Sequence, residues 1–319
     1  MTRIPRPRWF DFAGALLALA FVLVAAFAGT ISPESEKTPG SFKQIGRRTD
    51  QKPHPPDEKA LLGTLPQQFD VFHSLVWGAK DALDFSLKVV FFASAIGMLV
   101  GIISAYAGGW FNSLLMRVTD SFLTIPLIVG VVFIQQLVRV SVEALTEGQT
   151  YAWWLKGIDP VTQSNWLIET FTVVNPVLVA FIVLGWMQYA RLMNTIILEI
   201  KQNDYISATR ALGAGNLRVI FKHLLPNAYG PMLILASRDL GNIVILQATL
   251  TFLELGGEST WGQLLAMGRG WVIGPGGRLL DTWWVYLPAT LVVILFGVTW
   301  NLVGETLQHL LGADKKVGL

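Results

Sequence analysis

Two charged residues stand side by side in an otherwise apolar stretch of the chain. Arg238 and Asp239 interrupt the segment 233–246, which reads LILASRDLGNIVIL. At the centre of a membrane-spanning helix each costs about 2.5–3.5 kcal/mol, so each needs water or a polar partner. Because adjacent helical residues point in different directions, the two cannot simply neutralise each other. We therefore expect one of them to face a central cavity and the other to face a polar group on a packed helix.

Two interpretations of Arg238 stay open at this level. It could form a buried ion pair with another span, for example one that carries Asp120. Alternatively, it could line a translocation path, where its charge would favour an anionic or carboxylate-bearing solute. Asp239 and Gln247 are further candidates for such a path. All of these are binding roles, and none of them involves bond cleavage.

The sequence gives no sign of an enzyme. The four histidines, at positions 54, 73, 223 and 309, are scattered and belong to neither an H-E-x-x-H nor a G-x-S-x-G setting. No cysteine is present, which excludes a thiolate nucleophile and a cysteine-based metal site. The chain also lacks the G-x-x-x-x-G-K-[ST] loop that cradles ATP. We predict no catalytic residue, no metal site and no cofactor bound by this chain.

Composition places the chain in a lipid bilayer. Hydrophobic residues make up 52% of the 319 residues and charged residues only 14%, against about a quarter in ordinary soluble domains. The net charge of +2 is too small to indicate nucleic-acid binding. Spanning helices need about 20 mostly apolar residues. Six segments meet this requirement: Trp9–Ile31, Phe85–Ala107, Leu114–Val138, Val173–Ile197, Tyr229–Phe252 and Trp283–Gly304. The predicted fold class is therefore an all-α polytopic membrane protein.

Lysine and arginine set the expected orientation. They gather before the first span, in the insert near residue 210 and in the tail, so these three places should share the cytoplasmic side, with both termini. Residues 32–84 should then form an external loop, loosely ordered over Ser32–Lys59 and with a short interfacial helix within Leu61–Asp84. A second external stretch, Glu254–Asp281, should fold back against the outer face. The loop Val140–Thr172 is also expected outside.

The insert Tyr205–Asn227 reads YISATRALGAGNLRVIFKHLLPN, and it is polar and basic. A helix over 204–212 could end at Gly213 and Gly215 in the left-handed conformation, and Asn216 could cap a second helix that ends before Pro226. The pattern predicts a helix-turn-helix. By periodicity alone it could equally be an amphipathic pair in the lipid interface.

The order of residues in the insert resembles the cytoplasmic loop of ABC importer permeases, whose pattern is E-A-A, three residues, Gly, nine residues and I-x-L-P. In this chain Ser207-Ala208-Thr209 stands at E-A-A, Gly213 at the glycine, His223 at the isoleucine, and Leu225-Pro226 close the pattern. In that family a short helix docks on an ATPase subunit and transmits its closure to the membrane helices. The resemblance implies the following ATPase-coupling residues: Tyr205, Ser207, Ala208, Thr209, Arg210, Leu212, Gly213, His223, Leu225 and Pro226.

Three further stretches resemble the C-type permease of the oligopeptide, dipeptide and nickel importers. They are AYAGGWFNSLLMRVTDSFLTIP at 105–126, ATLTFLELGGESTWGQLL at 248–265 and WNLVGETLQHLL at 300–311. The chain departs from that family where Leu65 replaces an acid of the external L-G-T-D, where an expected arginine near Ser74 is absent, and where Gln247 replaces a usual glutamate. These changes lie near the substrate-facing side, so the family's substrate range transfers poorly to this chain.

The resemblance implies a permease subunit of an ATP-driven importer in the bacterial inner membrane, carrying peptides or similar small solutes such as nickel complexes. Expected partners are a second homologous permease, an external substrate-binding protein and two cytoplasmic ATPase subunits that hold ATP and Mg. The expected regions are 1–31 (terminus and first span), 32–84 (external loop), 85–312 (permease domain, with the coupling loop at about 200–227) and 313–319 (tail). The alternative is an ion-driven secondary transporter, which would show paired broken helices.

Overall fold

The computed structural model describes residues 9–34, 40–47, 49–156, 175–274, 277–278 and 280–313, without the side chains of 9–11, 142–156 and 312–313. Over these residues the chain is helical, and its only β features are isolated bridges, which confirms the all-α prediction. Four helices carry most of the bundle: α3 (Val71–Ala107), α7 (Pro176–Lys201), α10 (Leu225–Phe252) and α12 (Trp283–Ala313). The others are α1 (Trp9–Ala26), α2 (Ala28–Ile31), α4 (Gly109–Leu123), α5 (Leu127–Lys156), α8 (Asp204–Ala211), α9 (Asn216–Val219) and α11 (Thr260–Gly268), with 3₁₀ turns at Pro66–Gln68 and Arg269–Trp271.

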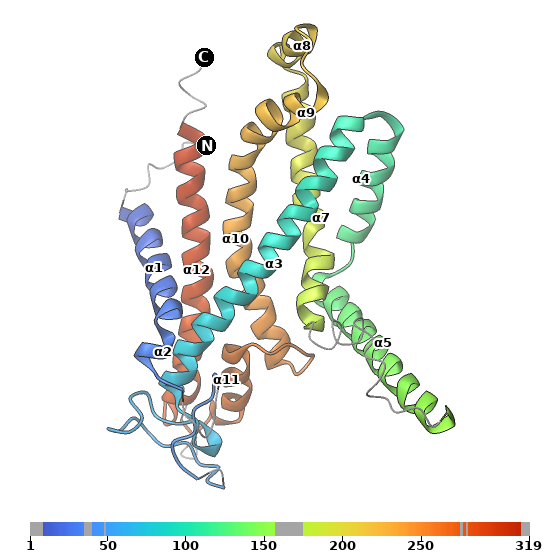
Figure 1. Cartoon of the computed structure of the whole chain (residues 1–319). Coiled ribbons are helices and arrows are strands. Elements are labelled where there is room, and N and C mark those ends of the chain that lie inside the picture. The colour runs from blue at the N-terminus through green and yellow to red at the C-terminus, as the bar shows by residue number, and fades with distance from the viewer. Residues whose placement is uncertain are drawn as a thin grey trace.

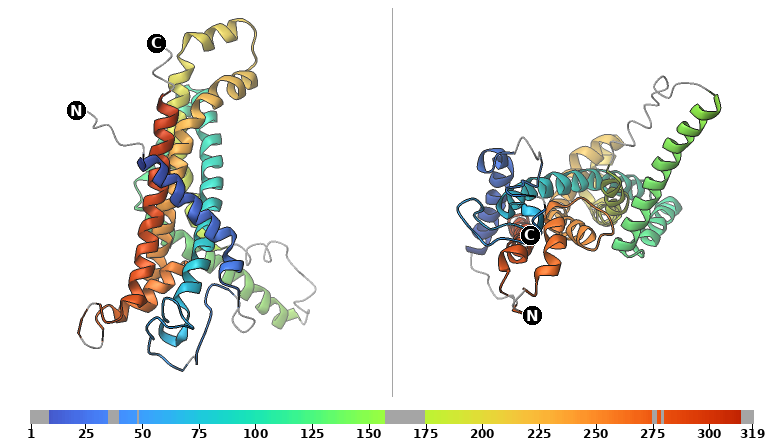
Figure 2. Two further views of the ribbon diagram at one scale, coloured as in Figure 1. Left: turned by 90° about the vertical axis from the view of Figure 1, so that its left-hand side faces the viewer. Right: turned by 90° about the horizontal axis from the view of Figure 1, so that it is seen from below.

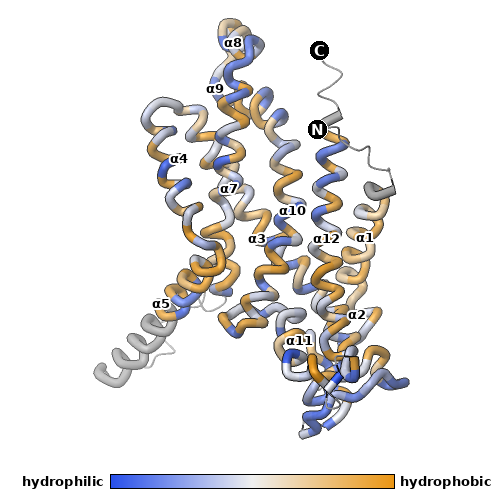
Figure 3. The backbone as a smooth tube through the Cα atoms, turned by 180° about the vertical axis from the view of Figure 1, so that it is seen from behind, coloured by the Kyte–Doolittle hydropathy of each residue, from blue (hydrophilic) through white to orange (hydrophobic). Residues whose placement is uncertain are grey.

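The described helices agree with a multi-pass membrane protein. Four of them are long and apolar enough to cross a bilayer, and the bent pair of α4 and α5 brings the number to five. A shorter apolar helix covers Phe12–Ala26. The six predicted spans thus correspond to four full-length helices, one bent pair and one shorter helix. Figure 3 shows hydrophobic residues concentrated along the helices, with more hydrophilic residues at α8 and in the loops at the opposite end.

The third predicted span, Leu114–Val138, is wrong as a single helix. The chain turns through 94° between α4 and the first half of α5. Pro126 is the physical reason, because a proline disfavours the helical conformation of the residue before it. Helix α5 also continues to Lys156, into the stretch that we expected to be the external loop Val140–Thr172. Residues 157–174 lie outside the described part of the chain.

The second predicted span begins too late. Helix α3 starts at Val71, where the carboxylate of Asp70 accepts a hydrogen bond of 2.9 Å from the backbone N–H of Phe72. This is an N-cap, and the helix then runs for 37 residues without a break. The interfacial helix expected within Leu61–Asp84 is therefore mostly the first part of α3, and the domain boundary at residue 84 falls inside a helix.

The loop before α3 is ordered where it is described, which corrects the prediction for Ser32–Lys59. Backbone bonds join Ile45 to Gln68 at 2.9 Å and Thr64 to His54 at 2.9 Å. Asp81 of α3 accepts hydrogen bonds from Ser41 at 2.6 Å and from Thr260. The polar composition of this loop serves such bonds, which composition alone could not distinguish from disorder.

The bundle has two different ends, seen in Figures 1 and 2. The α8 end carries α8 and α9, the start of α1 and the end of α12. The opposite end, here called the loop end, carries α2, the segment 40–70 and α11. The described part of 254–281 folds back there: its helix α11 buries Trp261 against Phe21 and Phe296 at ring-centroid distances of 6.3 and 5.5 Å.

Helices α3 and α7 pack closely along the middle of the bundle. A Cβ atom at Gly97 would lie 2.4 Å from the carbonyl oxygen of Trp186, and one at Gly101 would lie 2.6 Å from that of Ala190. The two glycines, four residues apart, therefore let the α3 backbone approach α7, as small residues do at helix interfaces in membranes. This contact places the residues of α7 that form the candidate site.

Candidate coupling site and translocation path

Helix α8 forms as predicted to within one residue. It begins with Asp204 and has Arg210 in its last turn, charges that suit the two poles of a helix. The chain leaves it at Gly213, whose φ is +87°, a value that favours glycine. The second expected left-handed glycine is wrong, because Gly215 has φ −67° and serves as the N-cap of α9.

The predicted second helix does not end before Pro226. Helix α9 covers Asn216–Val219, a π-helical turn covers Ile220–Leu224, and α10 follows directly. Pro226 lies at the start of α10, where its missing N–H costs little. The insert thus consists of α8, a short turn and a second helical part. That second part continues without a break into the long helix that ends at Phe252.

Helix α8 is anchored on one side. Ile206 is 1% exposed and belongs to a cluster with Val219 and Leu224. The hydroxyl of Tyr106, at the end of α3, donates to Oδ1 of Asn216 at 2.5 Å. The guanidinium of Arg210 lies 5.4 Å from the centroid of the same tyrosine ring. These contacts connect α8 to α3, to α9 and to the π-helical turn that precedes α10.

The other side of α8 is open. Most of the predicted coupling residues are exposed, and three are partly buried. The exposed ones are Tyr205, Ser207, Ala208, Arg210, Leu212, Gly213 and Pro226, and the partly buried ones are Thr209, His223 and Leu225. Leu212 is 90% exposed and Leu217 is 71% exposed, although both are apolar. This side of the insert thus presents large apolar side chains to its surroundings.

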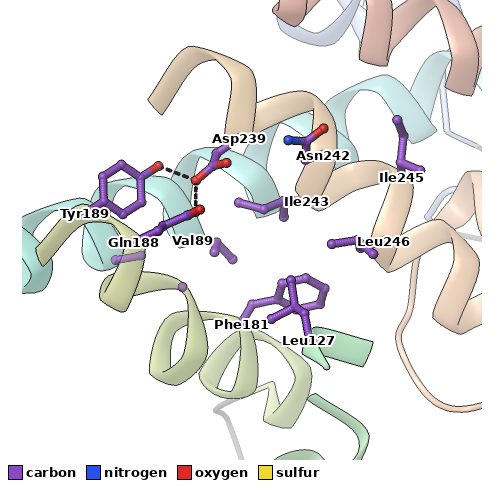
Figure 4. A pocket seen from close by; sticks show the side chains of 12 residues that line it. Val89, Leu127, Phe181, Gln188, Tyr189, Asp239, Asn242, Ile243, Ile245 and Leu246 are labelled. Carbon is purple, nitrogen blue, oxygen red and sulfur yellow. Dashed lines mark hydrogen bonds between the residues drawn. The ribbon is translucent and has the colours of Figure 1, made fainter. Parts of the chain in front are cut away.

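A cavity of about 360 Å³ lies between α3, α7 and α10, next to the start of α5. Asp239, at the middle of α10 and 6% exposed, contributes its carboxylate to the wall. Tyr189 donates to Oδ2 of Asp239 at 2.7 Å, and Gln188 donates to the same oxygen. Figure 4 shows both side chains reaching from α7 to Asp239. This agrees with the expectation that one of the two charged residues faces a cavity.

Arg238 points elsewhere. Its guanidinium donates to Oε1 of Gln308 on α12 at 3.0 Å, and it is not among the residues that line the cavity. The ion pair that we considered between Arg238 and Asp120 is wrong, because Asp120 pairs with Arg191 of α7. Gln247 is buried and also lies outside the cavity lining.

Sequence reasoning missed a polar stripe on α7. Gln188, Arg191, Thr195 and Glu199 are all exposed and lie three or four positions apart, so they share one face of the helix. The stripe starts at the Asp239 cavity and runs toward the α8 end. The spacing was visible in the sequence, but the apolar residues between these positions hid it.

A second, polar cavity of about 340 Å³ lies on this stripe between α4 and α7. It is lined by Arg117, Asp120, Arg191 and Thr195, together with Asn112, Ser113, Met116 and Asn194. The Arg191–Asp120 ion pair lies within it. From the pair toward the α8 end, Nδ2 of Asn194 donates to Ser104 at 2.5 Å and to Asn112 at 2.6 Å. Two cavities, one apolar with a carboxylate and one polar, therefore follow each other along α7.

These features are those of a multi-pass helical membrane protein with two cavities along α7 and an exposed helical tip. The chain belongs to the family of binding-protein-dependent transport system inner membrane components, which matches residues 97–316. It is a permease subunit of an ABC importer, and the ion-driven alternative is set aside.

Curated permease proteins of peptide transport systems are similar to this chain over most of its length. The probable D,D-dipeptide transport system permease protein of Escherichia coli strain K12 is 28% identical over 83% of this chain and 76% of its own length. The dipeptide transport system permease protein of Alkalihalophilus pseudofirmus is 25% identical over 95% of this chain and 85% of its own. The di/tripeptide transport system permease protein of Pseudomonas aeruginosa is 26% identical over 97% and 91%.

Proposed function

We propose that this chain forms half of a translocation path for short peptides or similar small solutes, completed by a second homologous permease. An external binding protein delivers the solute, and two ATPase subunits that hold ATP and Mg dock at the α8 end. Support for the solute class comes from the relatives, which are named as transporters of dipeptides and of di- and tripeptides. The resemblance to the oligopeptide, dipeptide and nickel importers adds nickel complexes to the proposed class of solutes.

The observation that carries the path is the polar stripe of α7. An amide, a guanidinium and a carboxylate along one face of a membrane helix are costly against lipid. Gln188 and Arg191 have partners in this chain, yet both stay exposed, which favours water or another protein chain beside this face. The stripe also joins the two cavities, which gives a route from the middle of the bundle toward the α8 end. We assign the described face of α7 to the path on this basis.

The coupling role of α8 rests on its two-sided character. Its buried side is held by Ile206 against α9 and the π-helical turn before α10, and by the contact of Arg210 with Tyr106 of α3, whereas its open side presents Leu212 and Tyr205. An ATPase that grips the open side would therefore move the bundle helices through the fixed side. The loop at about 200–227 carries Lys201, Arg210, Arg218 and Lys222, which favours a cytoplasmic position for the α8 end.

Gly213 provides the test of coupling. A Cβ there meets nothing within 4 Å, but φ +87° strains any other residue, and an acid would also stand at the open side. In the reconstituted complex, Gly213→Asp should abolish transport and substrate-stimulated ATPase activity. Gly215→Asp is the matched control, because it adds the same charge at an open position with φ −67°. Normal transport and normal stimulated ATPase activity in Gly213→Asp would refute the coupling assignment.

The orientation can be tested with single cysteines, since the chain has none of its own. Glu58→Cys at the loop end and Arg218→Cys at the α8 end both replace exposed residues. An impermeant thiol reagent added to intact cells should label the first and spare the second. The reverse pattern would place the α8 end outside and would exclude an ATPase there.

A further inference from the structure

The Asp239 cavity has a feature that a path alone does not require: a single carboxylate in the middle of the membrane helix. At 1.5 Å per residue, Asp239 lies about 20 Å from either end of α10. Its neighbours are neutral hydrogen-bond donors, namely Tyr189 and Gln188, and the side chain of Asn242 interacts with the same carboxylate. No described lysine or arginine forms an ion pair with it.

The carboxylate has acceptor capacity left. Tyr189 and Gln188 both donate to Oδ2, and neither donates to Oδ1. An ionised carboxylate offers about four lone-pair sites, so Tyr189, Gln188 and Asn242, three neutral donors, do not saturate it. A buried charge without a cation partner is costly, and a cation that arrives in the cavity would remove that cost.

The remaining cavity wall indicates what else the ligand carries. Val89, Phe181, Ile243 and Leu246 line it with apolar side chains, next to the exposed amide of Asn242. Its volume of about 360 Å³ falls in the range of small-molecule sites. The site suits a small solute with one positive group and an apolar body.

We propose that this cavity is a solute-binding station and that Asp239 binds a protonated amine of the passing solute, such as the free amino terminus of a short peptide. This inference rests on the proposed function and adds that the path selects solutes with a positively charged group. The competing explanation is that Asp239 only holds α10 to α7 through Tyr189 and Gln188. In that case the cavity would have no preference for cations.

The first test measures charge preference without any transport. Asn242→Cys puts a unique thiol of this chain in the cavity, one helical turn from Asp239. In the assembled complex, the modification rates by 2-aminoethyl and 2-sulfonatoethyl methanethiosulfonate are measured by mass spectrometry of this chain. Adding Asp239→Asn should lower the cation-to-anion rate ratio by about tenfold, equivalent to about 1.4 kcal/mol. Glu58→Cys, at an exposed position of the loop end, is the control whose ratio Asp239→Asn should leave unchanged.

Two outcomes would overturn the proposal. An unchanged ratio would mean that Asp239 does not select cations, and a thiol that reacts with neither reagent would mean that solutes do not enter the cavity. If Asp239→Asn prevents assembly, Asp239→Glu replaces it: a retained cation preference supports the proposal, and a lost one contradicts it. None of these results depends on peptide transport, so they can fail or succeed separately from the proposed function.

The second test uses the transport reaction. A dipeptide and its N-acetyl derivative differ by the amine charge, and Asp239→Asn should reduce the preference for the free amine by about tenfold. In the double variant Asp239→Asn/Asn242→Asp the carboxylate returns to the cavity from the next turn of α10, and part of the preference should return. A purely structural Asp239 predicts equal losses for both peptides and no recovery. Transport of neither peptide by the unaltered complex would refute the peptide assignment, while the thiol test would still decide the charge preference.

Discussion

The two ends of the bundle are built in opposite ways. At the loop end, α11 and the segment 40–70 close over a cluster of aromatic and aliphatic side chains, with Trp261 and Leu65 at 1% and 0% exposure. At the α8 end, one buried isoleucine and a few polar contacts hold a helix whose outer side chains stay exposed. One end is stabilised by its own packing, and the other leaves apolar area for a partner.

This difference separates stability from assembly. A side chain buried within the chain stabilises the fold by itself, whereas an exposed apolar side chain contributes only when something covers it. Substitutions at the loop end should therefore change the unfolding temperature of the complex. Substitutions on the open side of α8 should change its association or activity with little effect on unfolding.

The largest effect is expected at Trp261. Its ring packs between Phe21 and Phe296, and its Nε1 donates to the carbonyl of Leu75 at 3.1 Å. Trp261→Ala should lower the free energy of unfolding by about 3–5 kcal/mol, the usual cost of removing a buried tryptophan. Thermal unfolding of the purified complex in detergent measures this. Leu217→Ala is the control at the other end, and an equal loss there would abolish the contrast between the ends.

A smaller loss should follow from truncating the anchor of α8. Ile206 is buried, so Ile206→Ala should cost about 2–4 kcal/mol locally and release α8 from its cluster. Hydrogen exchange over 204–219 should then be faster, while exchange over 260–268 at the loop end stays the same. Leu212→Ala serves as the control, because this side chain is 90% exposed and its loss should leave both segments unchanged. Unaltered exchange in Ile206→Ala would show that α8 is held by something else.

The smallest effect concerns Tyr106, which touches two parts of the insert. Tyr106→Phe removes the hydrogen bond to Asn216 but keeps the ring under Arg210. We expect a cost of about 1 kcal/mol and a modest fall in stimulated ATPase activity, since one connection between α3 and the insert is lost. Tyr106→Ala removes both contacts and should lower that activity further. Equal activities of the two variants would mean that the cation–π contact adds nothing.

The sequence allowed prediction of what local rules determine. The residues at 204–212 are compatible with a helix, and Gly213 follows them as a helix end. Helix α8 lies there. The adjacent charges of Arg238 and Asp239 had to separate, and they point to α12 and α7. By contrast, the pairing of Asp120 with Arg191 depends on how α4 folds back along α7, which no local pattern encodes. The same holds for the cavity, whose walls come from four helices.

Two of the incorrect predictions concern local signals, a proline and an N-cap residue. Pro126 indicates a break, but the apolar run around it is long enough for one span, so hydrophobic length predicts a single helix where the structure has a bent pair. Asp70 is a good N-cap residue, but the boundary of the apolar segment was placed by hydrophobicity instead. Hydrophobic length therefore locates membrane segments well and helix ends poorly, since ends depend on single hydrogen bonds and dihedral angles.

The close contact at Gly97 and Gly101 has a consequence for how α3 and α7 would move. With the two backbones in contact, we expect α3 and α7 to move together as one stiff rod, because close-packed interiors transmit strain. Helix α7 has 26 residues and is therefore about 39 Å long. A rotation of the rod by about 5°, applied where α8 joins it, would sweep its far end through about 3 Å. Such a displacement is comparable to the width of a water molecule. Through the glycine contact, a small movement at the α8 end would therefore produce a larger one at the loop end of α7.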